Sequence, residues 1–229
     1  MTLNRILPVI VLCGAFAAAA AAATIDANIG TTPVRLVTPA DFCLVQHSDP
    51  GDVKLLDTVS AAIPNILLAM SVDCRQLAAW HAGKPPGLQD ISQYQTPKNP
   101  ADTLVSGDPR AWIAGQCADL RAHGAQYFAE ETPASKKRVE DAIKGMQYHG
   151  VVDLGVLRQD DATCYYGAVQ NYTTAEGRDA NQLVVAALTV IKGRSVIHYV
   201  FTPYAGTGSI TSTLNRNAAT IADLKAANR

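Results

Sequence analysis

The stretch KGRSVIHYVFTPY, Lys192 to Tyr204, decides the fold, because it predicts a strand that is apolar on both faces. Side chains alternate between the two faces of a strand. One face carries Ile197, Tyr199 and Phe201, and the other carries Val196, His198 and Val200. A sheet with two apolar faces needs cover on both, and helices predicted before and after this stretch are available to give it.

The last third of the chain predicts an antiparallel meander followed by a helix. Four β-prone runs are separated by the short segments RQDD, AEGRD and KGR. These runs are residues 151–159, 162–174, 180–193 and 195–204. A helix then begins at Gly206–Ser209, and its apolar face carries Ile210, Leu214, Ile221 and Leu224. We therefore predict an α+β fold whose mainly antiparallel sheet is covered by helices on both faces, an α/β/α sandwich.

The first two thirds of the chain predict short strands between helices. Strands are expected at residues 34–37, 42–45 and 65–72. Residues 84–103 are rich in Pro, Gly, Asn and Gln, so we expect an irregular region with one short strand at 91–94. This long region is also a natural candidate for a functional loop.

Helix starts are marked by capping residues. Asp49–Pro50 and Asp108–Pro109 each place a capping aspartate before a proline that the first turn tolerates. The second of these helices is expected to run through about Phe128. Asp73 and Gln76 resemble a capping box, which predicts a helix that ends at the glycine and prolines of residues 83–86.

A separate helix is predicted to begin at Thr132–Pro133. Its inward face would carry Val139, Ile143 and Met146. Gly145 and the glycine at 150 would bracket its end.

Residues 1–23 are typical of a secretory signal peptide. Arg5 precedes an apolar run and an alanine tract, and Ala21 and Ala23 supply the small residues of a cleavage site near Ala23. Residues 24–229 would then form a single globular domain in the bacterial periplasm or outside the cell. A lipid anchor at Cys13 is disfavoured because Leu12 is not the small residue that such a site needs.

The charge balance disfavours nucleic acid as a partner. The whole chain has a net charge of −1, and the loss of Arg5 with the signal peptide makes it −2. No basic field remains to hold a phosphate backbone. We expect no membrane span after cleavage, and a protein, a lipid or another envelope component as the partner.

Four cysteines remain after export: Cys43, Cys74, Cys117 and Cys164. An even number in an oxidising compartment favours two disulfides, and spacing alone leaves three pairings open. We favour Cys43 with Cys74 and Cys117 with Cys164. The alternative is four buried free thiols, because cysteine also packs as a small hydrophobic side chain.

His198 is the one histidine whose setting raises the question of catalysis. A lone histidine on a covered sheet is more often a hydrogen-bonded core residue than a catalyst, so we interpret His198 as structural. If it were catalytic, Tyr166, Tyr172 and Cys164 on nearby strands would be its candidate neighbours. The catalytic alternative is therefore a His198 base with Tyr166 or a serine nearby.

Contiguous motifs for cofactors, metals or nucleophiles are not found. GTGSI at Gly206–Ile210 does not match the G-x-S-x-G elbow of hydrolases. HAGKPPG at His81–Gly87 has prolines where a phosphate loop needs N–H donors. The five histidines do not form an H-E-x-x-H pair, and the acidic pair Asp160–Asp161 is explained by a hairpin turn. We expect no cofactor and no metal site.

The order of elements resembles the MOG1/PsbP-like sandwich proteins that bacteria export. The resemblance covers most of the mature chain: short strands, a helix, NILLAMSVDCRQL, a helical middle, a meander and a C-terminal helix ending in DLKAAN. It implies an accessory, assembly or binding protein and brings no catalytic signature.

These observations leave three hypotheses about function. The first is an exported, non-catalytic binding or accessory protein. The second is a secreted hydrolase with a noncontiguous site near His198, since catalytic groups converge in space rather than along the chain. The third is a small-molecule carrier with its ligand between sheet and helices.

Overall fold

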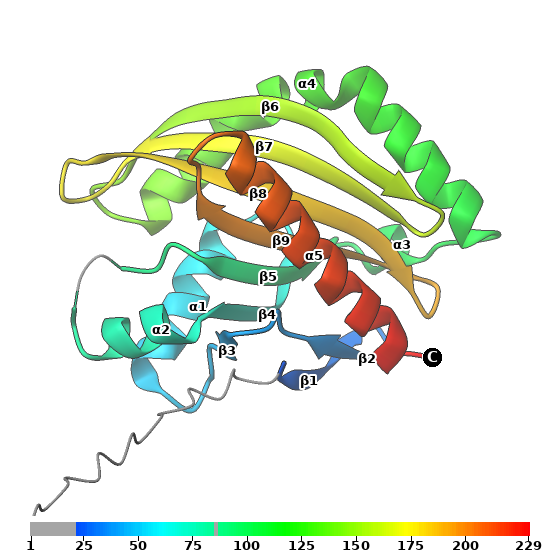
Figure 1. Cartoon of the computed structure of the whole chain (residues 1–229), viewed down its shortest axis with the longest axis horizontal. Helices are drawn as coiled ribbons and strands as arrows, with labels where there is room; N and C mark the ends of the chain where they lie inside the picture. Colours follow the sequence, from blue (N-terminus) through cyan, green and yellow to red (C-terminus); the bar gives the residue numbers. More distant parts are fainter. Residues whose placement is uncertain (1–21, 85–86) are drawn as a thin grey trace, which may run out of the picture.

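The computed structural model describes residues 22–84 and 87–229 (Figure 1). The predicted signal peptide therefore lies outside the described residues, except for Ala22 and Ala23. Among the described helices, none combines the length and the apolar character needed to cross a bilayer.

The strands are β1 Thr24–Ile29, β2 Thr32–Val37, β3 Phe42–Leu44, β4 Ile66–Asp73, β5 Ile91–Thr96, β6 Gln147–Asp160, β7 Thr163–Thr173, β8 Asp179–Ile191 and β9 Arg194–Pro203. The helices are α1 Pro50–Ala62, α2 Cys74–His81, α3 Pro100–Thr103, α4 Pro109–Ala142 and α5 Thr207–Ala227.

Seven strands form one antiparallel sheet in the order β3-β4-β5-β9-β8-β7-β6. The strands β6 to β9 pair consecutively along the chain, and α5 follows β9. The prediction of a mixed α+β chain with a large antiparallel sheet and helices is confirmed.

The two faces of β8 pack against different helices. Leu183 and Val185 belong to a cluster against which Leu214 of α5 packs, and α5 crosses in front of β8 and β9 in Figure 1. Leu188 and Val190 alternate with them along the strand and belong to the cluster around α4. Both apolar faces of this strand are therefore covered, as its sequence requires.

The hairpin formed by β1 and β2 was not fully predicted, because β1 follows directly on the signal segment. Ile25, Ala27 and Ile29 alternate with polar residues along β1, which is the period of a half-buried strand. Ile29 packs in one cluster with Ile221 and Leu224 of α5. The hairpin therefore extends the cover on the α5 side of the sheet.

The predicted break at Thr132 is wrong, because α4 is one helix of 34 residues. Pro133 lies inside it and Met146 lies beyond its end. A proline removes one backbone hydrogen bond and leaves the carbonyl four residues earlier, here Ala129, without its helical partner. Pro133 and Ala129 are both exposed, so water can bond to that carbonyl.

The region predicted to be irregular contains a central strand. The short strand expected near Ile91 extends to Thr96 as β5, which pairs with β4 on one side and β9 on the other. The middle of the proposed functional loop is therefore sheet. In this register Tyr94 lies opposite His198, so Ser92 lies two residues from that pair.

Both favoured disulfides are confirmed. Cys43 is bonded to Cys74, with the Cα atoms 4.8 Å apart, and joins β3 to α2. Cys117 is bonded to Cys164, with the Cα atoms 5.6 Å apart, and joins α4 to β7. Each bond therefore fixes a helix to the sheet.

Candidate functional site

His198 lies on β9, is fully buried and has a polar partner on each side of its ring. Its Nε2 is 2.7 Å from the Ser92 hydroxyl of β5. Its Nδ1 is 2.8 Å from Oδ1 of Asn217, which comes from α5. Three elements that are separate in the chain therefore converge on one imidazole.

The orientation of the Asn217 amide decides the tautomer of His198. Asn217 Nδ2 donates to the carbonyl oxygens of Val185, at 2.7 Å, and of His198, at 3.2 Å. Its Oδ1 therefore faces the ring and must accept a hydrogen bond from Nδ1–H of His198. The other ring nitrogen, Nε2, is left to accept the hydrogen bond that the Ser92 hydroxyl donates.

This chain of hydrogen bonds has the order of a catalytic relay: a hydroxyl, a base and a group that orients the base. The relay is closed to substrate, because Ser92 is only 1% exposed and His198 is 0% exposed. The cavity beside Ser92 and Tyr94 measures about 10 Å³, which is room for roughly one water molecule. It is too small for a substrate or for the ligand that a carrier would hold there.

Burial lowers the pKa of His198 from 6.5 to about 4, and the hydrogen bond with Asn217 offsets part of that effect. The imidazole is therefore neutral at pH 7. The Tyr94 ring packs beside it in a tilted arrangement, with ring centroids 4.3 Å apart, and the Tyr94 hydroxyl donates to the Val37 carbonyl oxygen. Every polar group around the ring has a partner, as a structural role requires.

The structure does not bring Tyr166 to His198. Their partners on β8 are the neighbouring residues Ala186 and Ala187, so the two side chains lie on opposite faces of the sheet. Tyr166 instead donates its hydroxyl to Oδ1 of Asp153, at 2.6 Å. Burial and this carboxylate raise the pKa of Tyr166, which therefore stays protonated at neutral pH. Cys164, another candidate neighbour of His198, is held in its disulfide on the α4 side.

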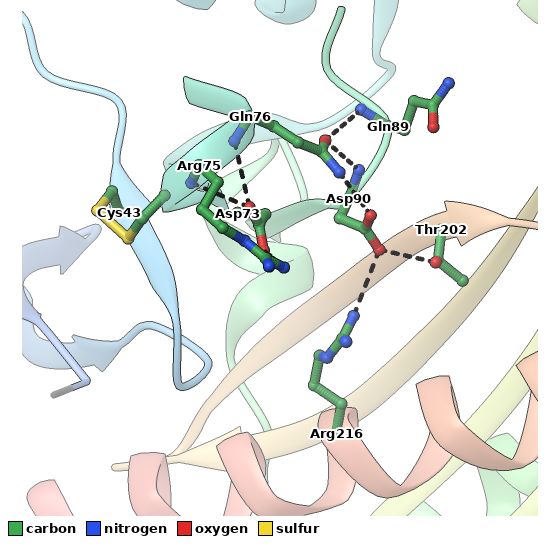
Figure 2. Close-up of polar contacts among 9 residues, drawn as sticks. Cys43, Asp73, Arg75, Gln76, Gln89, Asp90, Thr202 and Arg216 are labelled. Carbon is green, nitrogen blue, oxygen red and sulfur yellow. Dashed lines mark hydrogen bonds and ion pairs between the residues drawn. A yellow bond between two sulfur atoms is a disulfide. The ribbon is translucent and has the colours of Figure 1, made fainter. Parts of the chain in front are cut away.

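A second polar network lies around Asp90, just before β5 (Figure 2). Asp90 Oδ2 accepts from Gln76 Nε2 of α2, at 2.7 Å. Its Oδ1 accepts from the Thr202 hydroxyl of β9, at 2.7 Å, and lies 3.5 Å from Nη1 of Arg216. Arg216 precedes Asn217 on α5, so this network and the His198 network share the contact between α5 and the sheet.

The structure confirms one half of the predicted capping box and corrects the other half, which concerns Gln76. Asp73 caps α2 as expected, accepting from the backbone N–H groups of Arg75 and Gln76. The Gln76 side chain does not return to the cap. It accepts from the backbone N–H groups of Gln89 and Asp90 at 2.7 and 2.9 Å, as Figure 2 shows. The capping pattern therefore located the helix but not the partner of Gln76.

An open groove of about 610 Å³ lies between the first turns of α4 and the β6–β7 turn. Arg110 and Arg121 line it from the helix, and Asp160 and Asp161 line it from the turn. Asp160 lies 3.9 Å from Nζ of Lys225. Within the described part of the chain, the two guanidinium groups have no hydrogen bond or ion pair of their own. The groove thus offers two free cationic donors beside carboxylates.

The groove was not predicted from the sequence. Arg110 and Arg121 are 11 residues apart in the sequence, which places them on one face of a helix about three turns apart. That spacing was a usable signal. What faces them depends on how α4 lies over the β6–β7 turn, and the sequence does not specify this.

No family model matches this chain. The search of curated proteins also finds no match.

Proposed function

We propose that this protein is an exported, non-catalytic binding protein of the bacterial periplasm or exterior, and that it binds a protein partner in the groove beside α4. The groove is lined by Arg110, Arg121, Asp160 and Asp161. Side chains of both charge signs suit the mixed surface of a protein better than a lipid headgroup of a single charge.

The observation that carries this proposal is the contrast between the two polar sites. Ser92, His198 and Asn217 satisfy one another and are closed to solvent. Arg110 and Arg121 are exposed and free to bond an incoming group. Arginine pairs with carboxylates through two parallel hydrogen bonds, which gives both affinity and orientation.

Export is part of the proposal. Two disulfides that each fix a helix to the sheet are typical of proteins that fold in an oxidising compartment. A MOG1/PsbP-like sandwich is also part of it, and the packing of α4 and α5 on different faces of β8 supports this layout. The accessory and binding roles implied by that resemblance agree with a groove that binds a partner.

The binding proposal is tested by photo-crosslinking in the cells that export the protein. A benzoylphenylalanine at Ala114, in the groove, should give a discrete adduct with a partner. The same probe at Ala134, exposed farther along α4, is the control and should not. Combining the Ala114 probe with Arg110→Glu and Arg121→Glu should remove the adduct. Equal adducts from both positions, or none from Ala114, would contradict the proposal.

A hydrolase is the second candidate, and the Ser92–His198–Asn217 relay is the one observation that favours it. A fluorophosphonate probe separates the two functions, because it reacts only with an activated serine that it can reach. Labelling that is lost in Ser92→Ala and kept in Tyr166→Phe would support the hydrolase. We expect no labelling, since Ser92 is buried beneath α5 and the β1–β2 hairpin.

A further inference from the structure

The helices α1 and α2 bring together a histidine and two aspartates. Asp49 caps α1, Asp52 lies in its first turn, and His81 is the last residue of α2. One donor atom from each residue lies within 4.8 Å of the other two. His81 Nε2 is 2.7 Å from Oδ1 of Asp52.

Only one of the two aspartates forms the cap of α1. The cap is formed by Oδ1 of Asp49, which accepts from the backbone N–H groups of Gly51 and Asp52. Asp52 is not needed for it, yet its side chain is only 3% exposed, an unusual place for a carboxylate. Its Oδ2 accepts from the Gln46 backbone N–H at 2.8 Å, which fixes its direction. Among the described residues, His81 is its only ion-pair partner.

We propose that Asp49, Asp52 and His81 form a binding site for a divalent transition-metal ion, of which Zn²⁺ is the representative. One imidazole nitrogen with two carboxylate oxygens is a donor set for Zn²⁺ and its neighbours, whereas Ca²⁺ and Mg²⁺ prefer oxygen ligands alone. The backbone N–H groups of Gly51 and Gln46 donate hydrogen bonds to the two carboxylates and would fix their orientation toward the ion.

Burial differs across the site in a way that suits this ion. Asp52 is buried, whereas Asp49 is exposed and the side chain of His81 is 38% exposed. Three protein ligands would therefore hold the ion from one side, and water would complete a tetrahedral shell from the other. Because the ligands come from two helices, the bound ion would tie α1 to α2 in addition to the contacts that they already make.

The fluorescence of Trp80 can report whether an ion is bound at this site. The ring centroid of Trp80 is 5.3 Å from that of His81, and a β-carbon on Gly51 would lie 3.5 Å from Cη2 of Trp80. A paramagnetic ion such as Co²⁺ bound at the site should therefore quench the fluorescence of Trp80. The quenching should be lost in Trp80→Phe and kept in Trp112→Phe, which removes the other tryptophan of the chain.

The experiment uses untagged mature protein, stripped with EDTA and titrated with ZnCl₂ by calorimetry. We expect one ion per chain and a melting temperature that rises by about 5–11 °C at 100-fold excess over Kd. His81→Asn and Asp49→Ser should each weaken binding by at least about 10-fold. Serine also caps helices, so Asp49→Ser removes the ligand and keeps the cap.

His123→Asn is the matched control. His123 also lies beside an aspartate, with Nδ1 3.0 Å from Oδ1 of Asp119, but no third ligand completes a described cluster there. This variant should bind Zn²⁺ like the unmodified protein. Absence of binding up to 100-fold molar excess, or binding that is unchanged in both His81→Asn and Asp49→Ser, would overturn the proposal. The site shares no residue with the groove, so either proposal can fail alone.

Discussion

Oδ1 of Asn217 accepts a hydrogen bond from Nδ1 of His198 at 2.8 Å, and neither side chain is exposed to solvent. This contact joins α5 to β9 beside the apolar cluster that includes Ala187, Val196 and Ile221. A buried hydrogen bond of this kind specifies how two elements align, because any shift would leave polar groups without partners. The position of α5 on the sheet is therefore fixed by polar contacts as well as by apolar packing.

Acidification should destabilise the protein through His198. Burial lowers the pKa of His198 from 6.5 to about 4 in the folded state. Between these values the unfolded chain takes up a proton that the folded protein does not, so the free energy of unfolding falls as the pH falls. From pH 7.5 to pH 5 the loss from this group should be about 2 kcal/mol.

Urea denaturation at the two pH values measures this effect. Carboxylates also titrate, so the comparison is with His198→Gln, which keeps a polar side chain but cannot titrate. The variant should be less stable at pH 7.5 and should lose less on acidification. If both proteins lose the same amount, the buried histidine is not the cause.

Asn217→Ala should be strongly destabilising. The asparagine makes three hydrogen bonds inside the core, and its removal leaves Nδ1–H of His198 and the Val185 carbonyl without this partner. We expect a loss of about 3 kcal/mol in the free energy of unfolding. Asn215→Ala, an exposed change two residues away on α5, should stay within about 0.5 kcal/mol. Similar small losses for both variants would show that the network contributes little.

Patterns local to the sequence predicted the elements that depend on local physics. The alternation around His198 predicted a doubly covered strand, and capping aspartates located the starts of α1, α2 and α4. The interpretation of His198 as a buried core residue agrees with its full burial. Each of these features is set by residues within a few positions of one another.

Partners that are distant in the chain could not be predicted. Ser92 is 106 residues from His198, and Asn217 meets it from a different element 19 residues later. A serine in a strand and an asparagine in a helix carry no signal of mutual contact until the register of β5 and β9 is known. The same holds for Asp49 and Asp52, whose contact with His81 depends on how α1 and α2 pack.

Gly124 and Gly115 of α4 should respond in opposite directions to alanine. A β-carbon at Gly124 would overlap the Tyr166 hydroxyl and ring, which must move and break the contact with Asp153. We expect a loss of about 1–3 kcal/mol for Gly124→Ala. At Gly115 a β-carbon meets nothing within 4 Å, so alanine should stabilise the helix by about 0.5–1 kcal/mol.

Thermal or urea denaturation of the two glycine variants tests this contrast. Both positions lie in the same helix, so the intrinsic preference of alanine over glycine is shared. The difference between the two variants then reports the packing of α4 on Tyr166. Stabilisation by Gly124→Ala would mean that α4 does not approach β7 this closely.

The two disulfides should differ in how easily a reductant reaches them, whereas the lengths of the loops that they close are similar. They span 31 and 47 residues, and by loop-closure entropy alone each is worth about 4 kcal/mol. Cys117 and Cys164 are 0% and 1% exposed, whereas Cys43 and Cys74 are half-buried. Dithiothreitol applied to the folded protein should therefore reduce Cys43–Cys74 first, since exchange requires a thiolate to reach a sulfur atom. Alkylation at successive times, followed by peptide mass spectrometry, gives the order. Simultaneous reduction of both disulfides would mean that the reductant reaches each of them only after global unfolding. Cys117–Cys164 would then be no better protected in the folded protein than Cys43–Cys74, which contradicts the prediction.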